Sequence, residues 1–150
     1  MPTRAEWLLR FVAGSSDQTP WVDKVRIMKG IFLLQRHASC PSEIDYHFKP
    51  YDYGPFTPEI YRDLEQLAAA GLVTSSSADA YRVTEEGKQL LSRLIFPEPA
   101  ESALLEIREE VVGLTFRRLL RRVYLEFPES ARRFIAKDVL DDIGGRPHMR

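Results

Sequence analysis

Apolar residues recur at helical spacing through most of the chain. Side chains three and four positions apart share one face of a helix, so this pattern predicts amphipathic helices. The helix over residues 22–37 is apolar around much of its circumference and is expected to be central and buried. The pattern over 100–127 fits one long helix or two helices joined near Gly113. The expected helices cover residues 3–13, 22–37, 58–70, 84–94, 100–127 and 130–140.

A short hairpin is predicted after the third helix. Gly71 is typical of the residue that follows a helix, because glycine adopts positive φ at little steric cost. Residues 72–74 and 81–84 flank a polar turn, and the second segment alternates between apolar and polar side chains, which predicts two paired strands. Residues 38–50 show only a weak alternation and are expected to form a loop or a short strand.

The order of these elements resembles a winged helix, as in MarR-like and PadR-like regulators. The predicted fold class is mostly α with a small β-hairpin wing. A winged helix-turn-helix-like core is expected in residues 1–97, a C-terminal helical extension in 98–141 and a flexible tail in 142–150. The apolar stripes of the extension predict that it packs on the core, on a second copy of the chain, or on both. A homodimer is therefore a hypothesis.

Three segments are similar to the Panacea-domain family, which includes SocA-like antitoxins and YwgA-like proteins. They are the aromatic turn at 53–56, the helix that runs into Gly71-Leu72-Val73, and residues 123–129, where Phe127 replaces the second tyrosine of the family motif. The resemblance implies a winged-helix-like core that binds a protein partner. Such a module acts as an antitoxin that neutralises a toxin or brings it to a protease, or as a DNA-associated regulator. The resemblance brings no catalytic residues.

Composition predicts an ordinary globular chain. Of the 150 residues, 44% are hydrophobic and 29% are charged, which supplies enough apolar material for a core. The single cysteine, Cys40, cannot form an internal disulfide. The chain has no secretory pattern and no long apolar run, so the expected location is the cytoplasm, with no membrane partner.

The charges on the presumed reading helix, 58–70, argue against ordinary DNA recognition. Helical spacing places one basic and three acidic residues on its outward face, and one minus three gives a net charge of −2: Arg62, Glu59, Asp63 and Glu65. DNA phosphates repel such a helix. The wing turn at 75–79 has no basic residue, and only Arg82 and Lys88 lie near it. A protein partner is therefore favoured, and DNA is the alternative.

Positive charge gathers later in the chain, where four arginines fall on one helical face: Arg117, Arg118, Arg121 and Arg122. Arg132, Arg133 and Lys137 follow them. One interpretation is a solvated face balanced by nearby acids such as Glu106, Glu109 and Glu110. The other is a docking surface for nucleic acid or an acidic partner, to which Arg82 and Lys88 would also contribute.

Aromatic residues are dense between positions 46 and 61: Tyr46, Phe48, Tyr51, Tyr53, Phe56 and Tyr61. They predict either core packing around a tight turn or a groove for a partner. For the second interpretation the candidate partner-binding residues are Tyr51, Tyr53, Phe56, Glu59, Arg62 and Asp63.

No catalytic centre is predicted. His37, Cys40 and His47 match no zinc-ligand spacing, and no oriented third group or phosphate-binding loop accompanies them. Acid–base pairing is a weaker interpretation than surface charge for Asp52, Glu59 and Asp63. The predicted function is a non-enzymatic regulatory or interaction protein of the Panacea type, antitoxin-like or adaptor-like, with no cofactor and no metal. The alternative is a winged-helix DNA-binding transcriptional regulator.

Overall fold

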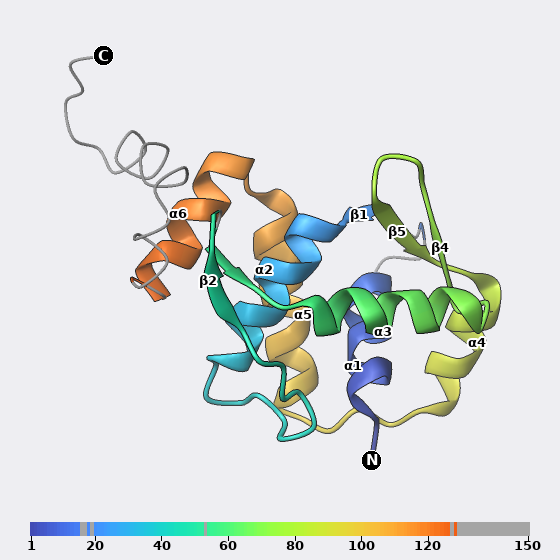
Figure 1. The fold of residues 1–150 in the computed structure, drawn as a ribbon. Coiled ribbons are helices and arrows are strands. Elements are labelled where there is room, and N and C mark those ends of the chain that lie inside the picture. The colour runs from blue at the N-terminus through green and yellow to red at the C-terminus, as the bar shows by residue number, and fades with distance from the viewer. Residues whose placement is uncertain (16–17, 19, 53, 127, 129–150) are drawn as a thin grey trace, which may run out of the picture.

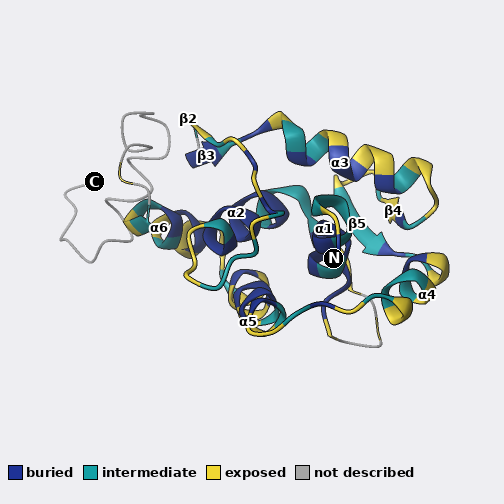
Figure 2. Cartoon of the chain, turned by 90° about the horizontal axis from the view of Figure 1, so that it is seen from below, coloured by how far each residue is buried: buried dark blue, intermediate teal, exposed yellow. Residues whose placement is uncertain are grey.

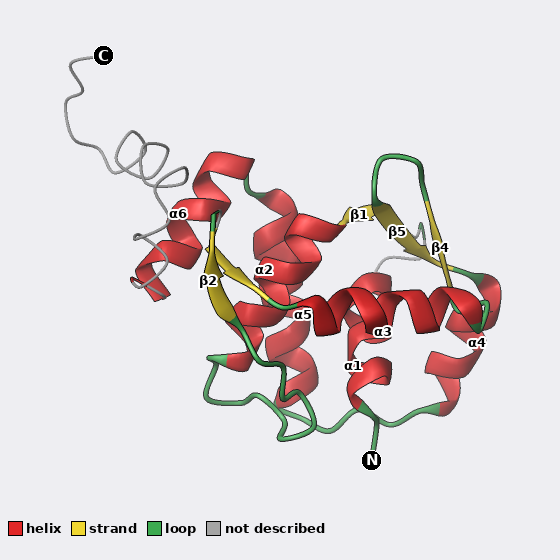
Figure 3. Ribbon diagram, viewed as in Figure 1, coloured by secondary structure: helices red, strands yellow, loops and turns green. Residues whose placement is uncertain are grey.

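The computed structural model describes residues 1–15, 18, 20–52, 54–126 and 128. Helices dominate it, with a small amount of antiparallel sheet (Figure 3). The predicted class, mostly α with a little β structure, is thus confirmed. The elements in chain order are α1 (Arg4–Ala13), β1 (Val22–Asp23), α2 (Lys24–Gln35), β2 (Lys49–Tyr51), β3 (Gly54–Phe56), α3 (Pro58–Ala69), β4 (Val73–Ser75), β5 (Ala80–Val83), α4 (Glu85–Arg93), α5 (Ala100–Gly113) and α6 (Phe116–Glu126).

Two features differ from the sequence prediction, and one alternative that the sequence left open is decided. The second helix begins at Lys24, because Val22 and Asp23 form a strand and the Asp23 side chain caps the helix. The pattern over 100–127 is two helices, with Leu114 as the C-cap of the first. Residues 49–56 form a hairpin that was not predicted. The expected helix at 130–140 and the tail at 142–150 lie outside the described residues.

The larger sheet is antiparallel, with the strand order β1-β5-β4 (Figure 1). Val22 of β1 pairs with Tyr81 of β5, and Val73 of β4 pairs with Val83 of β5. Val22, Val73 and Val83 are buried, so the sheet packs one apolar face on the helices. At the other end of the molecule the β2–β3 hairpin lies beside α6 (Figure 1).

The core is built around α2, as its sequence predicts. Eight consecutive residues of this helix, 27–34, are buried (Figure 2), and α1, α5, α6 and β3 all contact it. Gly30 permits the contact with α1, because a Cβ atom there would overlap the ring of Phe11. The third helix lies further out and packs on α1 and β4.

Two arginine side chains donate hydrogen bonds to the backbone carbonyls at the C-terminal ends of core helices. Arg108 of α5 is 2% exposed, and its Nε and Nη2 atoms donate to the carbonyl oxygens of Phe11 and Val12 at 2.7 and 3.2 Å. Arg26 of α2 does the same for α5, donating to the carbonyls of Val111 and Leu114 at 3.1 and 2.6 Å. The last carbonyls of a helix have no partner within it, so these bonds satisfy groups that burial would otherwise leave unpaired.

None of the helices in the described part of the chain is long and apolar enough to span a membrane.

Replacing Arg108 by alanine is expected to lower the free energy of unfolding by about 2–4 kcal/mol, because buried carbonyls of α1 lose their donors. Urea unfolding followed by circular dichroism measures this loss. Arg93→Ala, at an exposed position of α4, is the matched control and should change stability by less than about 0.5 kcal/mol. Equal midpoints for the two variants would show that Arg108 does not hold the helices together.

Candidate functional site

A groove of about 530 Å³ lies between the β2–β3 hairpin and the start of α3. Four of the six predicted partner-binding residues meet there, namely Tyr51, Phe56, Glu59 and Arg62. Asp63 does not line the groove, and Tyr53 lies outside the described residues. The remaining lining residues were not predicted: His47, Lys49, Pro50, Thr57 and Pro58.

The hairpin presents two stacked aromatic rings to this groove. Tyr51 and Phe56 have ring centroids 5.3 Å apart at an interplanar angle of 29°. The Phe56 and Tyr61 rings meet in a T-shaped arrangement with their centroids 5.4 Å apart. Gly54, the first residue of β3, has a φ of 110°, which a residue with a side chain rarely adopts. Tyr51 stays 53% exposed, so the stack offers an apolar surface to solvent.

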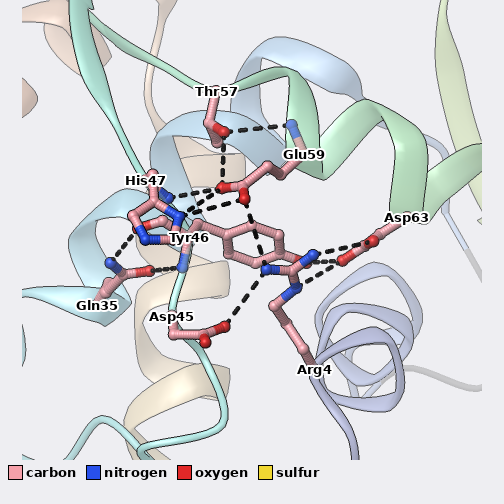
Figure 4. Close-up of polar contacts among 8 residues, drawn as sticks. All are labelled: Arg4, Gln35, Asp45, Tyr46, His47, Thr57, Glu59 and Asp63. Atoms are coloured by element: carbon pink, nitrogen blue, oxygen red, sulfur yellow. Dashed lines mark hydrogen bonds and ion pairs between the residues drawn. The ribbon is translucent and has the colours of Figure 1, made fainter.

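The start of α3 is fixed by Thr57 and Glu59 (Figure 4). The Thr57 hydroxyl accepts from the Glu59 amide at 3.2 Å, and the Glu59 carboxylate accepts from the backbone amide of His47 at 2.7 Å. Partial burial alone would raise the pKa of Glu59, but hydrogen bonds from His47 and Thr57 hold it below its ordinary value. The carboxylate is therefore ionised at neutral pH and bound to the loop before β2.

Asp63 faces the interior, so its predicted outward orientation was wrong. Its carboxylate accepts from the Tyr46 hydroxyl at 2.6 Å and from Arg4 Nε at 3.0 Å (Figure 4). The Arg4 guanidinium also lies over the Tyr46 ring, 4.3 Å from its centroid. Burial and the bond to Asp63 raise the pKa of Tyr46, so its hydroxyl remains a donor. The cluster joins α1, α3 and the loop before β2.

These internal bonds change the charge that α3 shows to solvent. Asp63 is buried and Glu59 is engaged by neighbouring residues, so the exposed charged side chains of the helix are Arg62 and Glu65. One positive and one negative charge give zero, where the sequence pattern predicted −2. The helix is therefore not the acidic surface that its sequence indicates.

Lys29 lies under the hairpin and supports it, and the sequence analysis did not single this residue out. It is 6% exposed, and its Nζ donates to the carbonyl of Pro55 at 3.3 Å. Burial lowers its pKa to about 8. Its spacing from Val25 and Phe32, four positions after one and three before the other, was the signal that it shares their face.

The predicted basic residues on the wing and on α4 lie outside the groove. The Arg82 guanidinium lies 4.3 Å from the centroid of the Trp21 ring. Lys88 Nζ lies 4.0 Å from a carboxylate oxygen of Glu85. Neither residue lines the groove. Their elements, β5 and α4, lie at the opposite end of the molecule from α6, so they do not form one basic surface with the arginines of that helix (Figure 1).

The predicted arginine face of α6 contains ion-paired and pocket-lining side chains, and Arg122 is both. Arg122 donates to Glu110 at 2.8 Å and to Glu126 at 3.1 Å, as a balanced surface would. Arg118 and Arg121 line a second pocket of about 480 Å³ with Leu114 and Leu125. Arg117 is exposed on the same helix. Arg132, Arg133 and Lys137 lie outside the described residues.

The described residues contain no group of three or more His, Cys, Asp or Glu side chains placed to hold a metal ion. Burial raises the pKa of the Cys40 thiol to about 11, so the thiol is protonated at neutral pH and is a poor nucleophile. His37 contacts the backbone of Ser39 through Nδ1 at 3.0 Å. The geometry around these residues therefore supplies no activated nucleophile.

Comparison of the chain with protein-family models, curated proteins and solved structures finds no match. The resemblance to the Panacea-domain family stays a prediction from the sequence. The groove between the hairpin and α3 is the candidate site on its geometry alone.

Changing Asp63 to asparagine is expected to destabilise the protein by roughly 1–3 kcal/mol, because Arg4 and Tyr46 lose a buried anionic acceptor. Glu65→Gln, at an exposed position of the same helix, should have little effect. Chemical unfolding of both variants tests this expectation. A smaller loss for Asp63→Asn than for Glu65→Gln would contradict it.

Stability should depend on pH through Lys29. Its folded-state pKa of about 8 lies below the ordinary value of 10.5, so the unfolded chain binds more protons between these pH values. The cost of the buried charge is fully present below pH 8 and declines as pH rises towards 10.5. Lys29→Met removes this cost, so the variant gains most over the native protein below pH 8. The difference in free energy of unfolding, variant minus native, should fall by up to about 3 kcal/mol as pH rises to 10.5. Urea unfolding over that pH range measures the difference, with Lys49→Met, at an exposed position of β2, as the control for the loss of a lysine side chain.

Proposed function

We propose that the chain is a non-enzymatic regulatory protein that binds a protein partner through the groove between the β2–β3 hairpin and α3. The observation that carries the proposal is the half-exposed Tyr51, stacked on Phe56 at the edge of a groove of about 530 Å³. Tyrosine at the centre of a pocket is a common anchor of protein interfaces, because it offers a large contact area at a low cost in conformational entropy.

The hairpin that carries this anchor is supported on its inner side. Lys29 bonds to Pro55, and α6 and α2 both contact β3. A surface held in this way loses little freedom when a partner docks, which favours affinity. The resemblance to the Panacea-domain family supports an antitoxin-like or adaptor-like role. A single thiol, at Cys40, fits a reducing compartment such as the cytoplasm.

A winged-helix DNA regulator is the second candidate. One support is the sheet with the strand order β1-β5-β4, in which α2 and α3 lie between β1 and β4 along the chain. The other is the loss of the expected acidic charge on α3. Two features weigh against it. The connection from α2 to α3 contains a whole hairpin in place of a short turn. At the wing turn, Lys24 Nζ lies 3.3 Å from a carboxylate oxygen of Asp79, so this lysine is already paired with an acid that DNA phosphates would have to replace.

A photo-crosslinking side chain at position 51 tests the protein-partner proposal in host cells. Position 92 is the control, because Ser92 is exposed on α4, at the opposite end of the molecule from β2 (Figure 1). A protein adduct is expected at 51 and not at 92. With that protein purified, Tyr51→Ala should weaken binding by roughly tenfold or more, and Ser92→Ala should not.

Identical adducts at both positions, or none at 51, would contradict the proposal. Binding of a mixed-sequence DNA duplex at low salt, lost on Arg62→Glu, would then favour the DNA regulator.

A further inference from the structure

The residues that line the groove carry more positive than negative charge, with Lys49 and Arg62 against Glu59. Lys49 and Arg62 are both exposed at its rim, and no described residue forms an ion pair with either side chain. The His47 side chain is 81% exposed at the same rim. The acid that lines the groove, Glu59, is occupied by the His47 amide and the Thr57 hydroxyl. A ligand entering the groove therefore meets cations and an aromatic surface.

The outer edge of β2 is poorly suited to pairing with a further strand. Pro50 and Pro55 face each other across the two strands, and neither has a backbone N–H. Paired residues alternate between bonded and non-bonded positions, so this pair is non-bonded and both proline carbonyls point outward. On the outer edge of β2, Pro50 has no N–H to donate to an added strand. On the outer edge of β3, the Pro55 carbonyl already accepts from Lys29. Recognition through side chains is therefore favoured.

We propose that the groove binds a protein segment that carries acidic side chains on either side of an apolar anchor. The anchor packs on the Tyr51–Phe56 stack, and the carboxylates pair with Lys49 and Arg62. These cations come from separate elements, since Lys49 is paired with Phe56 across the hairpin and Arg62 lies on α3. The inference rests on the proposed function and names the class of its partner.

Single-stranded nucleic acid is the competing ligand, since it also combines bases that stack with negative charge. Two observations favour the peptide. The two rings stack on each other and form one platform, whereas a nucleic-acid strand uses successive platforms. The chain as a whole has a net charge of −1, which does not attract a long polyanion.

Selection of random peptides of about twelve residues on the full chain tests the inference. Enriched peptides should contain Asp or Glu on both sides of Phe, Trp or Leu. Synthetic, fluorescein-labelled forms of them should lose roughly tenfold or more in affinity for Lys49→Glu/Arg62→Glu, and bind more weakly as salt rises from about 50 to about 200 mM.

The control is Arg36→Glu/Arg93→Glu, which makes the same change of charge at exposed positions at the end of α2 and on α4 and should retain affinity. Equal loss in the control would assign binding to net charge and overturn the inference. So would enrichment of basic or neutral peptides, an absence of enriched peptides, or tighter binding of a twelve-nucleotide single strand (about the peptide length) in the same assay.

The two proposals fail separately. If position 51 captures a protein whose affinity is unchanged by Lys49→Glu/Arg62→Glu, the proposed function stands and the acidic-segment inference falls. If no protein is captured at position 51, the proposed function falls whatever the peptides show. Both substitutions are at exposed side chains, so unfolding midpoints should match the native protein and exclude misfolding as the cause.

Discussion

The arrangement of the helices depends on guanidinium groups that bind the carbonyl ends of neighbouring helices. Arg108 fixes α5 against the end of α1, and Arg26 fixes α2 against the end of α5. Helix α1 in turn carries Arg4, which holds α3 through the buried Asp63. The position of the groove is therefore set by a series of charged hydrogen bonds, and the first of these, at the end of α1, lies outside the groove. Apolar side chains around α2 fill the space between the helices.

Local signals in the sequence were sufficient for the main helices and for the strands at 73–83. Gly71, for example, adopts a φ of 76° and lets the amide of Leu72 bond back to Leu67, as expected after a helix. The β2–β3 hairpin escaped prediction because each strand has only three residues and both contain proline. Such short strands show no period of two, and proline is rarely read as strand.

The candidate site was only half predictable for a different reason. Helical spacing tells which residues share a face, but not what lies opposite that face. Asp63 was assigned to the surface because its partner, Arg4, is 59 positions away in the chain. The role of Lys29 was not recognised, because its spacing in the helix does not reveal the hairpin that covers it. Counting charges along α3 therefore exaggerated its acidity, and the choice between protein and DNA partners needed the tertiary contacts.

Gly14 and Arg108 show how such contacts could be recognised in other sequences. Gly14 has a φ of 65°, and a Cβ atom on it would collide with the Arg108 guanidinium. The two positions are far apart in the chain but form one structural unit, so they should vary together during evolution. A distant relative with the same helix arrangement would retain both residues or replace both, and this coupled pair is a criterion for finding relatives whose remaining sequence has diverged.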